Sequence, residues 1–112
     1  ELGEWRRGRV VAVVMDTRPC EAARELADGA DLLVCEATFL EAEGALAAEH
    51  GHMTARLAAE LARDAGVGRL LLTHLSARYP DPDGHRREAA AVFDAVDVAE
   101  DLMVVDLGGR AP

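Results

Sequence analysis

Three short apolar segments, separated by stretches with helical periodicity, constrain the fold of this 112-residue chain more than any other feature. The segments at 9–15, 31–35 and 69–73 are rich in valine and leucine, as expected for strands buried on both faces of a sheet. Between them, apolar residues recur at helical spacing and glycines stand where such helices would end. Parallel strands need a crossover of about a dozen residues, usually a helix. The sequence therefore predicts the α/β class, with βαβ units and a mostly parallel sheet.

The other segments predict loops, further helices and short strands. An irregular segment is expected at 41–52, followed by a helix at 54–66. Prolines, aspartates and a glycine mark 76–84 as a loop. Short strands are expected at 98–99 and at 103–107. The helix after the loop should have one apolar face, formed by Ala89, Val92, Phe93 and Val96.

Charge and composition exclude some classes of function. The net charge of −9, with arginine as the sole basic residue type apart from histidine, argues against nonspecific nucleic-acid binding through a basic surface. No stretch approaches the roughly 20 apolar residues that span a bilayer, and no signal peptide is evident, so we expect a cytoplasmic location without a membrane partner. Cys20 and Cys35 are expected to be free thiols. Because the chain lacks an initiating methionine, we expect a fragment: one partial domain over 1–112, frayed at 1–8 and 108–112.

Polar side chains follow all three predicted strands. Asp16, Glu36 and His74 should meet at the carboxyl edge of the sheet, where α/β proteins bind ligands. Singly, each has a structural explanation: a helix cap, a loop hydrogen bond or a buried imidazole. Burying an unpaired carboxylate or imidazole costs several kcal/mol, so three such groups at one edge favour a metal or catalytic site. His50 and His52 add imidazoles just before a helix start, where the helix dipole favours an anion such as phosphate.

Two segments of the sequence resemble a known family. "MDTRPCEAARELADGADLLVCEATFLE" and "HMTARLAAELARDAGVGRLLLTHLSARY" are similar to the C-terminal part of ribonuclease Z, the tRNA 3′-processing endonuclease of the metallo-β-lactamase fold. The resemblance spans roughly residues 8–107. It implies that the chain forms the C-terminal half of an αββα sandwich, and that the family's His-x-His-x-Asp-His motif and tRNA-gripping arm lie N-terminal to it.

The resemblance also implies the roles of four residues. Asp16 matches the aspartate that bridges two Zn²⁺ ions, and His74 matches the last metal-binding histidine. His52 matches the catalytic histidine, which would donate a proton to the leaving oxygen, and Glu36 matches the glutamate that supports it. The other metal ligands are absent from this chain.

The sequence departs from the family pattern at three positions. Met15 replaces a glycine, Cys35 a histidine and Met53 a serine. None of these changes removes an implied ligand, but Met53 lacks a hydroxyl that could contact a substrate phosphate, which leaves Thr54 as the candidate in that loop. Arg78, just after His74, is a further phosphate-binding candidate. The alternative interpretation, a surface arginine without a role, has equal weight.

The resemblance implies a zinc-dependent endoribonuclease that removes the 3′ trailer from precursor tRNA and acts as a homodimer, with this chain inactive alone because it holds few of the ligands. Manganese in place of zinc stays open. Another hydrolase of the same fold would share the strand-end acid and histidine, but not the "CEATF" and "HMTA" motifs. A noncatalytic module that self-associates through an exposed sheet edge is the remaining alternative.

Overall fold

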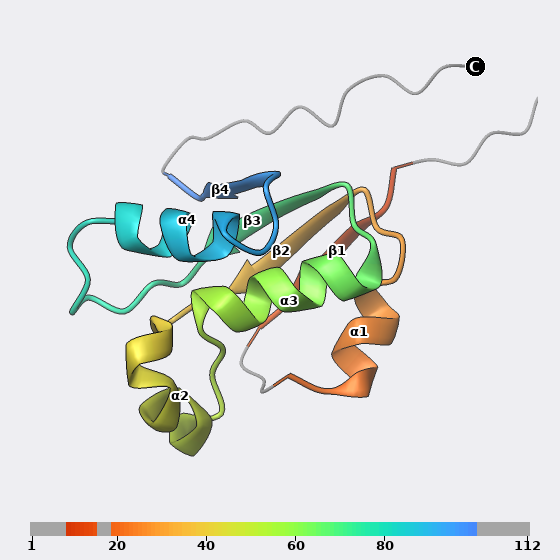
Figure 1. Cartoon of the computed structure of the whole chain (residues 1–112). Coiled ribbons are helices and arrows are strands. Elements are labelled where there is room, and N and C mark those ends of the chain that lie inside the picture. Colours follow the sequence, from red (N-terminus) through yellow and green to blue (C-terminus); the bar gives the residue numbers. More distant parts are fainter. Residues whose placement is uncertain (1–8, 16–18, 101–112) are drawn as a thin grey trace, which may run out of the picture.

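The computed structural model describes residues 9–15 and 19–100, and in this part of the chain helices cover one face of a parallel sheet (Figure 1). The ends predicted to fray, 1–8 and 108–112, lie outside it. The strands follow one another in sequence order across the sheet, and all neighbouring pairs are parallel. The predicted α/β class with a parallel sheet is confirmed. The strands are β1 (Val11–Val14), β2 (Leu32–Glu36), β3 (Arg69–Thr73) and β4 (Val96–Val98).

Three helices pack on the same face of this sheet (Figure 1). They are the crossover helices α1 (Glu21–Ala27), α3 (Ala55–Ala65) and α4 (Asp83–Ala90). Crossovers between parallel strands are nearly always right-handed, so strands in sequence order place successive helices on one side. The central helix α3 contacts both α1 and α4. None of the described helices is long and apolar enough to cross a membrane.

The core between the sheet and these helices is rich in alanine. The helix predicted at 54–66 is confirmed as α3, with both of its caps. Thr54 Oγ1 accepts a hydrogen bond from the backbone N–H of Leu57 at 3.1 Å, and Gly66 ends the helix in the left-handed conformation. Alanine has the highest helix propensity and lets the helix approach the strands closely. The buried alanines of α3 are Ala55, Ala58, Ala59, Ala62 and Ala65.

The opposite face of the sheet is exposed at β1, although Leu32 on the same face of β2 is buried. In β1, Ala12 and Val14 are buried, whereas Val11 and Val13 are 50% and 54% exposed. The prediction that the strand at 9–15 is covered on both faces therefore holds for one face of this part of the chain. The reason is that the crossover helices all lie on the same side.

The segment between β2 and α3 is more regular than predicted. The interpretation of 41–52 as irregular is wrong, because a 3-10 turn at Glu41–Glu43 leads into helix α2 (Gly44–His50). Its alanine-rich sequence favours a helix, and Gly51 ends it in the left-handed conformation (φ 71°). Helix α2 lies beyond the carboxyl end of β2 (Figure 1).

The C-terminal part of the described chain also differs from the prediction. Val92, Phe93 and Val96 were expected on a helix face, which is wrong, because α4 ends at Ala90. Val96 instead begins β4, where it pairs with Leu70. A β-branched residue fits this half-buried strand position well. Val98 of the strand predicted at 98–99 belongs to β4. The strand predicted at 103–107 lies outside the described residues.

A histidine without a hydrogen-bonding partner is buried in α4. His85 is 0% exposed, and neither ring nitrogen has a partner among the described residues. Its ring packs edge-on against Tyr79, with centroids 4.9 Å apart. Burial lowers the pKa of His85 below its ordinary value of 6.5, and the Glu88 carboxylate and the nearby backbone of Ala37 oppose this shift only in part. The folded state therefore favours the neutral ring.

We expect His85 to make the protein less stable in acid. In the unfolded chain this histidine titrates near pH 6.5, so its contribution is present above about pH 6.5 and is lost as the pH falls through the lowered pKa of the folded state, by at most about 1.4 kcal/mol per pH unit. His85→Phe should remove this part of the pH dependence when the free energy of unfolding is measured in urea at about pH 7.5 and about pH 5. His50→Gln, at an exposed position, should retain it. Equal slopes in His85→Phe and the parent chain would contradict this assignment.

Candidate active site

The carboxyl ends of β2 and β3 lie side by side and carry two of the predicted site residues. Glu36 is the last residue of β2 and pairs in register with Thr73, the last residue of β3, which His74 follows. The loops beyond these strands stay together, because the backbone N–H of Ser76 donates to the carbonyl oxygen of Thr38 at 3.0 Å. This is the edge where ligand sites form in parallel sheets.

The loop before α3 is tied to the same edge. Phe39 and Thr54 form an isolated parallel bridge. The backbone N–H of Phe39 donates to the carbonyl oxygen of Met53 at 3.4 Å, and the N–H of Ala55 donates to that of Phe39 at 3.0 Å. These bonds bring His52 to the strand ends, although it lies in the connection between α2 and α3.

Three of the predicted site residues, Glu36, His52 and His74, meet here. One potential ligand atom from each lies within 4.8 Å of the other two. Glu36 is fully buried, the His52 side chain is 23% exposed, and His74 is exposed. The result is a pair of accessible imidazoles backed by a buried carboxylate, a set that can move a proton or hold a metal ion. The predicted bridging aspartate, Asp16, lies outside the described residues.

Both oxygens of the Glu36 carboxylate already accept hydrogen bonds. Oε1 accepts from the backbone N–H of Met53 at 2.7 Å, and Oε2 accepts from the backbone N–H and the hydroxyl of Thr38 at 3.1 and 2.7 Å. Oε1 also lies 3.5 Å from Nδ1 of His52. Such charge-assisted bonds are short and orient the carboxylate. Glu36 is thus placed to support His52, and the imidazoles are the groups left to bind a metal ion.

His74 has an unusual backbone conformation. Its φ of 59° is positive, which no other non-glycine residue shows in the described part of the chain. A non-glycine residue in this region costs on the order of 1–3 kcal/mol, and such strain concentrates at functional sites. The conformation brings Nδ1 of His74 to 3.3 Å from the Thr38 hydroxyl and its ring centroid to 6.1 Å from that of His52.

The two candidates for phosphate binding make contacts within the chain. Thr54 is 2% exposed, and its hydroxyl oxygen caps α3 as described above. Arg78 is exposed, forms an ion pair with Glu43, and holds its guanidinium carbon 5.4 Å from the centroid of the Phe39 ring. Of the two side chains, Arg78 is the one that is accessible to a ligand, and it also carries a positive charge.

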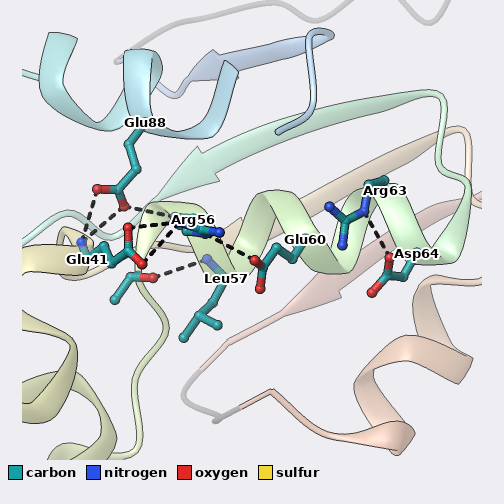
Figure 2. A network of polar contacts seen from close by, with 8 residues as sticks. Glu41, Arg56, Leu57, Glu60, Arg63, Asp64 and Glu88 are labelled. Atoms are coloured by element: carbon teal, nitrogen blue, oxygen red, sulfur yellow. Dashed lines mark hydrogen bonds and ion pairs between the residues drawn. The ribbon is translucent and has the colours of Figure 1, made fainter. Parts of the chain in front are cut away.

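A carboxylate from α4 occupies the N-terminus of α3. Glu88 accepts hydrogen bonds from the backbone N–H groups of Arg56, at 2.9 Å, and Glu41, at 3.1 Å (Figure 2). The Arg56 guanidinium in turn contacts the carboxylates of Glu41 and Glu60. The sequence predicts an anion such as phosphate at this helix start. In the structure, a side chain of the chain itself supplies the negative charge.

Glu88 should therefore stabilise the fold. We expect Glu88→Ala to lower the free energy of unfolding by about 1 kcal/mol, because two N–H groups lose their acceptor and the helix dipole its counter-charge. Urea denaturation measures this loss. Glu25→Ala, on the exposed side of α1, is the matched control and should change the free energy by less than about 0.5 kcal/mol. Equal effects of the two substitutions would contradict the capping role.

Two of the departures from the ribonuclease Z pattern touch one another. The Sγ of Cys35 lies 3.5 Å from the Sδ of Met53, and both residues are buried. Burial raises the pKa of the Cys35 thiol to about 12, with a smaller contribution from the Glu36 carboxylate. Neither cysteine forms a disulfide, and Cys20 is exposed. This sulfur contact joins the residue before Glu36 to the residue after His52.

One residue at the centre of the cluster, Thr38, was not predicted from the sequence. Its hydroxyl lies within 3.5 Å of atoms of Glu36, His52 and His74. A threonine two residues after a strand-end glutamate is a signal for a local side-chain hydrogen bond. Its proximity to the two histidines depends on the folded loops.

The chain is similar to curated proteins named ribonuclease Z. It is 56% identical over 109 residues to that of Salinibacter ruber, covering 97% of this chain and 34% of that protein. It is 50% identical over 112 residues to that of Streptomyces coelicolor, covering 98% of this chain and 37% of that protein. The chain thus spans about a third of the length of these relatives.

Solved structures and a family profile give the same picture. The metallo-beta-lactamase fold protein YhfI of Bacillus subtilis matches with a TM-score of 0.75 and 32% identity, over 82% of this chain and 37% of that chain. The short form of human tRNase Z matches with a TM-score of 0.69 and 34% identity, over 90% of this chain and 34% of that chain. The family profile described as "Beta-lactamase superfamily domain" matches residues 4–75, more than half of the chain. The chain belongs to the beta-lactamase superfamily and, as its sequence predicts, resembles ribonuclease Z within it.

Proposed function

We propose that this chain is part of a metal-dependent endoribonuclease that removes the 3′ trailer from precursor tRNA. The observation that carries the proposal is the meeting of Glu36, His52 and His74, from three separate segments, at the carboxyl edge of the sheet. The similarity to proteins named ribonuclease Z supports the substrate class. The alternative hydrolases of this fold are expected to lack the loops that bring Glu36 and His52 together.

In this proposal His52 donates a proton to the 3′-oxygen that leaves. The ring is partly exposed, as a group that meets substrate must be, and Glu36 lies 3.5 Å from Nδ1 on its buried side. A carboxylate there stabilises the cationic ring and fixes its orientation, so that the other ring nitrogen is the one that serves the substrate.

The donor set also fits a metal ion. His74 offers an exposed imidazole on a strand end, and neutral imidazole is a preferred ligand of Zn²⁺. We propose His74 and Asp16 as the ligands that this chain supplies. When bound, two Zn²⁺ ions supply Lewis-acid polarisation of the phosphodiester and activation of the attacking water.

Arg78 and Thr54 are the proposed phosphate contacts. Arg78 is the stronger case, since it is exposed and lies over Phe39 next to the site. Arg78→Ala should weaken tRNA binding and reduce the slope of log affinity against log salt concentration by about one. A series of affinity measurements at increasing salt concentration gives this slope. An unchanged salt dependence would show that Arg78 has no phosphate partner.

The chain spans about a third of its relatives, so we propose that the remaining metal ligands come from outside it and that the isolated chain is inactive. A cytoplasmic homodimer is the proposed form of the complete enzyme. Both proposals follow the ribonuclease Z resemblance.

Cleavage of a precursor tRNA tests the proposal. The longer protein that contains this chain should release the trailer at the 3′ end of the acceptor stem, lose this activity with a chelator and regain it with Zn²⁺, while the 112-residue chain alone should release none. Hydrolysis of a thioester or a β-lactam without cleavage of the tRNA would favour another hydrolase of the fold. A self-associating chain without metal or activity in any form would favour the noncatalytic module.

A further inference from the structure

The Thr38 hydroxyl lies between the three residues of the site. Its Oγ1 is 2.7 Å from Oε2 of Glu36 and 3.3 Å from Nδ1 of His74. It is also 3.5 Å from Nδ1 of His52. Thr38 is only 8% exposed, so water has little access to this hydroxyl. Its bonding partners are therefore the three side chains around it.

The direction of the hydroxyl proton follows from the chemistry of these partners. An ionised carboxylate only accepts hydrogen bonds, and the shortest contact of Thr38 Oγ1 is to the Glu36 carboxylate. The single hydroxyl proton therefore points to Glu36. The lone pairs of Thr38 Oγ1 remain, and they can only accept.

This arrangement fixes what His74 can present to Thr38. A neutral imidazole carries its proton on one of its two nitrogens. The hydrogen bonds that the two nitrogens make decide which of them carries it. Since Thr38 Oγ1 can only accept, the Nδ1 of His74 must be the protonated nitrogen for the 3.3 Å contact to be attractive. The lone pair then lies on Nε2.

We propose that Thr38 is a positioning residue that holds His74 as the Nδ1–H tautomer. Glu36 accepts the hydroxyl proton of Thr38, so the hydroxyl oxygen is left to accept from His74. The proposal deepens the proposed function, on which it rests for its purpose: a neutral imidazole with a free Nε2 is the form that binds a metal ion. The order of bonds is His74 Nδ1–H to Thr38 Oγ1, and Thr38 O–H to Glu36 Oε2.

The backbone around Thr38 is held firmly enough for this role. Its own N–H donates to Glu36 Oε2 at 3.1 Å, and its carbonyl oxygen accepts from Ser76 at 3.0 Å. The first bond fixes Thr38 relative to Glu36, and the second fixes it relative to the loop that carries His74. At 3.3 Å the contact of the imidazole is longer than a typical N–H···O bond but within hydrogen-bond reach.

Histidine-selective ¹⁵N NMR of the metal-free protein tests the proposal directly. At mildly alkaline pH, where imidazoles are neutral, each ring nitrogen reports whether it carries the proton. His74 should show a protonated Nδ1, and the exposed His50 ring serves as an internal reference. Thr38→Val, which keeps the shape but removes the acceptor, should lower the ratio of Nδ1–H to Nε2–H by about fivefold, the factor of one net hydrogen bond. Thr38→Ser should restore it.

A second variant, Glu36→Gln, tests the same proposal if Thr38→Val does not fold. Glu36→Gln offers an amide that can donate to Thr38, which frees the hydroxyl to point at His74 and should also shift His74 towards Nε2–H. A parent protein with His74 protonated on Nε2 would overturn the proposal, as would an unchanged tautomer ratio in Thr38→Val. These readings need neither metal nor tRNA, so they are independent of whether the protein cleaves RNA. A protein that cleaves tRNA with His74 in the Nε2–H form would keep the proposed function and lose this inference.

Discussion

Replacing His52 by alanine is expected to lower turnover on precursor tRNA by about 10²- to 10⁴-fold while the zinc content stays the same. The factor is that of general acid catalysis, which the proposed function assigns to this ring. The measurement is single-turnover cleavage by the longer protein, with metal analysis of the same sample. Zinc should remain because the proposed ligands are His74 and Asp16.

His50→Ala is the matched control for this substitution. It removes an imidazole two residues away, at the exposed end of α2, and should leave turnover within about twofold, since surface changes away from the site have small effects. If His52→Ala lost zinc together with activity, His52 would be reassigned as a metal ligand. Equal turnover in the two variants would remove His52 from the mechanism.

Replacing Glu36 by alanine should destabilise the fold by about 3 kcal/mol, because it leaves buried donors of Thr38 and Met53 without an acceptor. The two loops that it joins carry the other site residues, so activity should fall as well. The free energy of unfolding in urea measures the first effect. Glu36→Gln should lose less, because one amide oxygen can still accept from Met53.

Glu49→Ala controls for the loss of a glutamate. Glu49 is exposed on α2, and its replacement should change the free energy of unfolding by less than about 0.5 kcal/mol. A loss in Glu36→Ala no larger than in this control would show that the buried carboxylate does not hold the loops together.

The sequence predicts the arrangement of the sheet well because strand and helix patterns can be recognised within short segments. Apolar runs of strand length, separated by helical spacing, leave few arrangements other than parallel pairing with crossovers, and β1 to β3 form where they were expected. The helix α2 and the early end of α4 were missed. Helix α2 is only seven residues long, and helices this short depend on tertiary contacts, so its alanine content alone did not predict it. The position of Val96 is decided by its pairing with Leu70, which is also a tertiary contact.

The site was predictable to the extent that it depends on strand ends. Glu36 and His74 meet because neighbouring parallel strands end together, and the resemblance to ribonuclease Z adds His52. The hydroxyl of Thr38 and the carboxylate of Glu88 were not predictable in the same way. Their roles come from hydrogen bonds between loops and helices that are distant in the sequence. The roles of all the predicted site residues stay predictions: Asp16, Glu36, His52, Thr54, His74 and Arg78.

Anomalous diffraction at the zinc absorption edge, from crystals of the longer protein loaded with zinc, shows whether His74 is a metal ligand. We expect an anomalous peak about 2.0–2.1 Å from Nε2 of His74, and none at bonding distance from the Glu36 carboxylate. A peak bonded to Glu36, or crystals in which His74 has no metal neighbour while the protein still cleaves tRNA, would contradict this expectation.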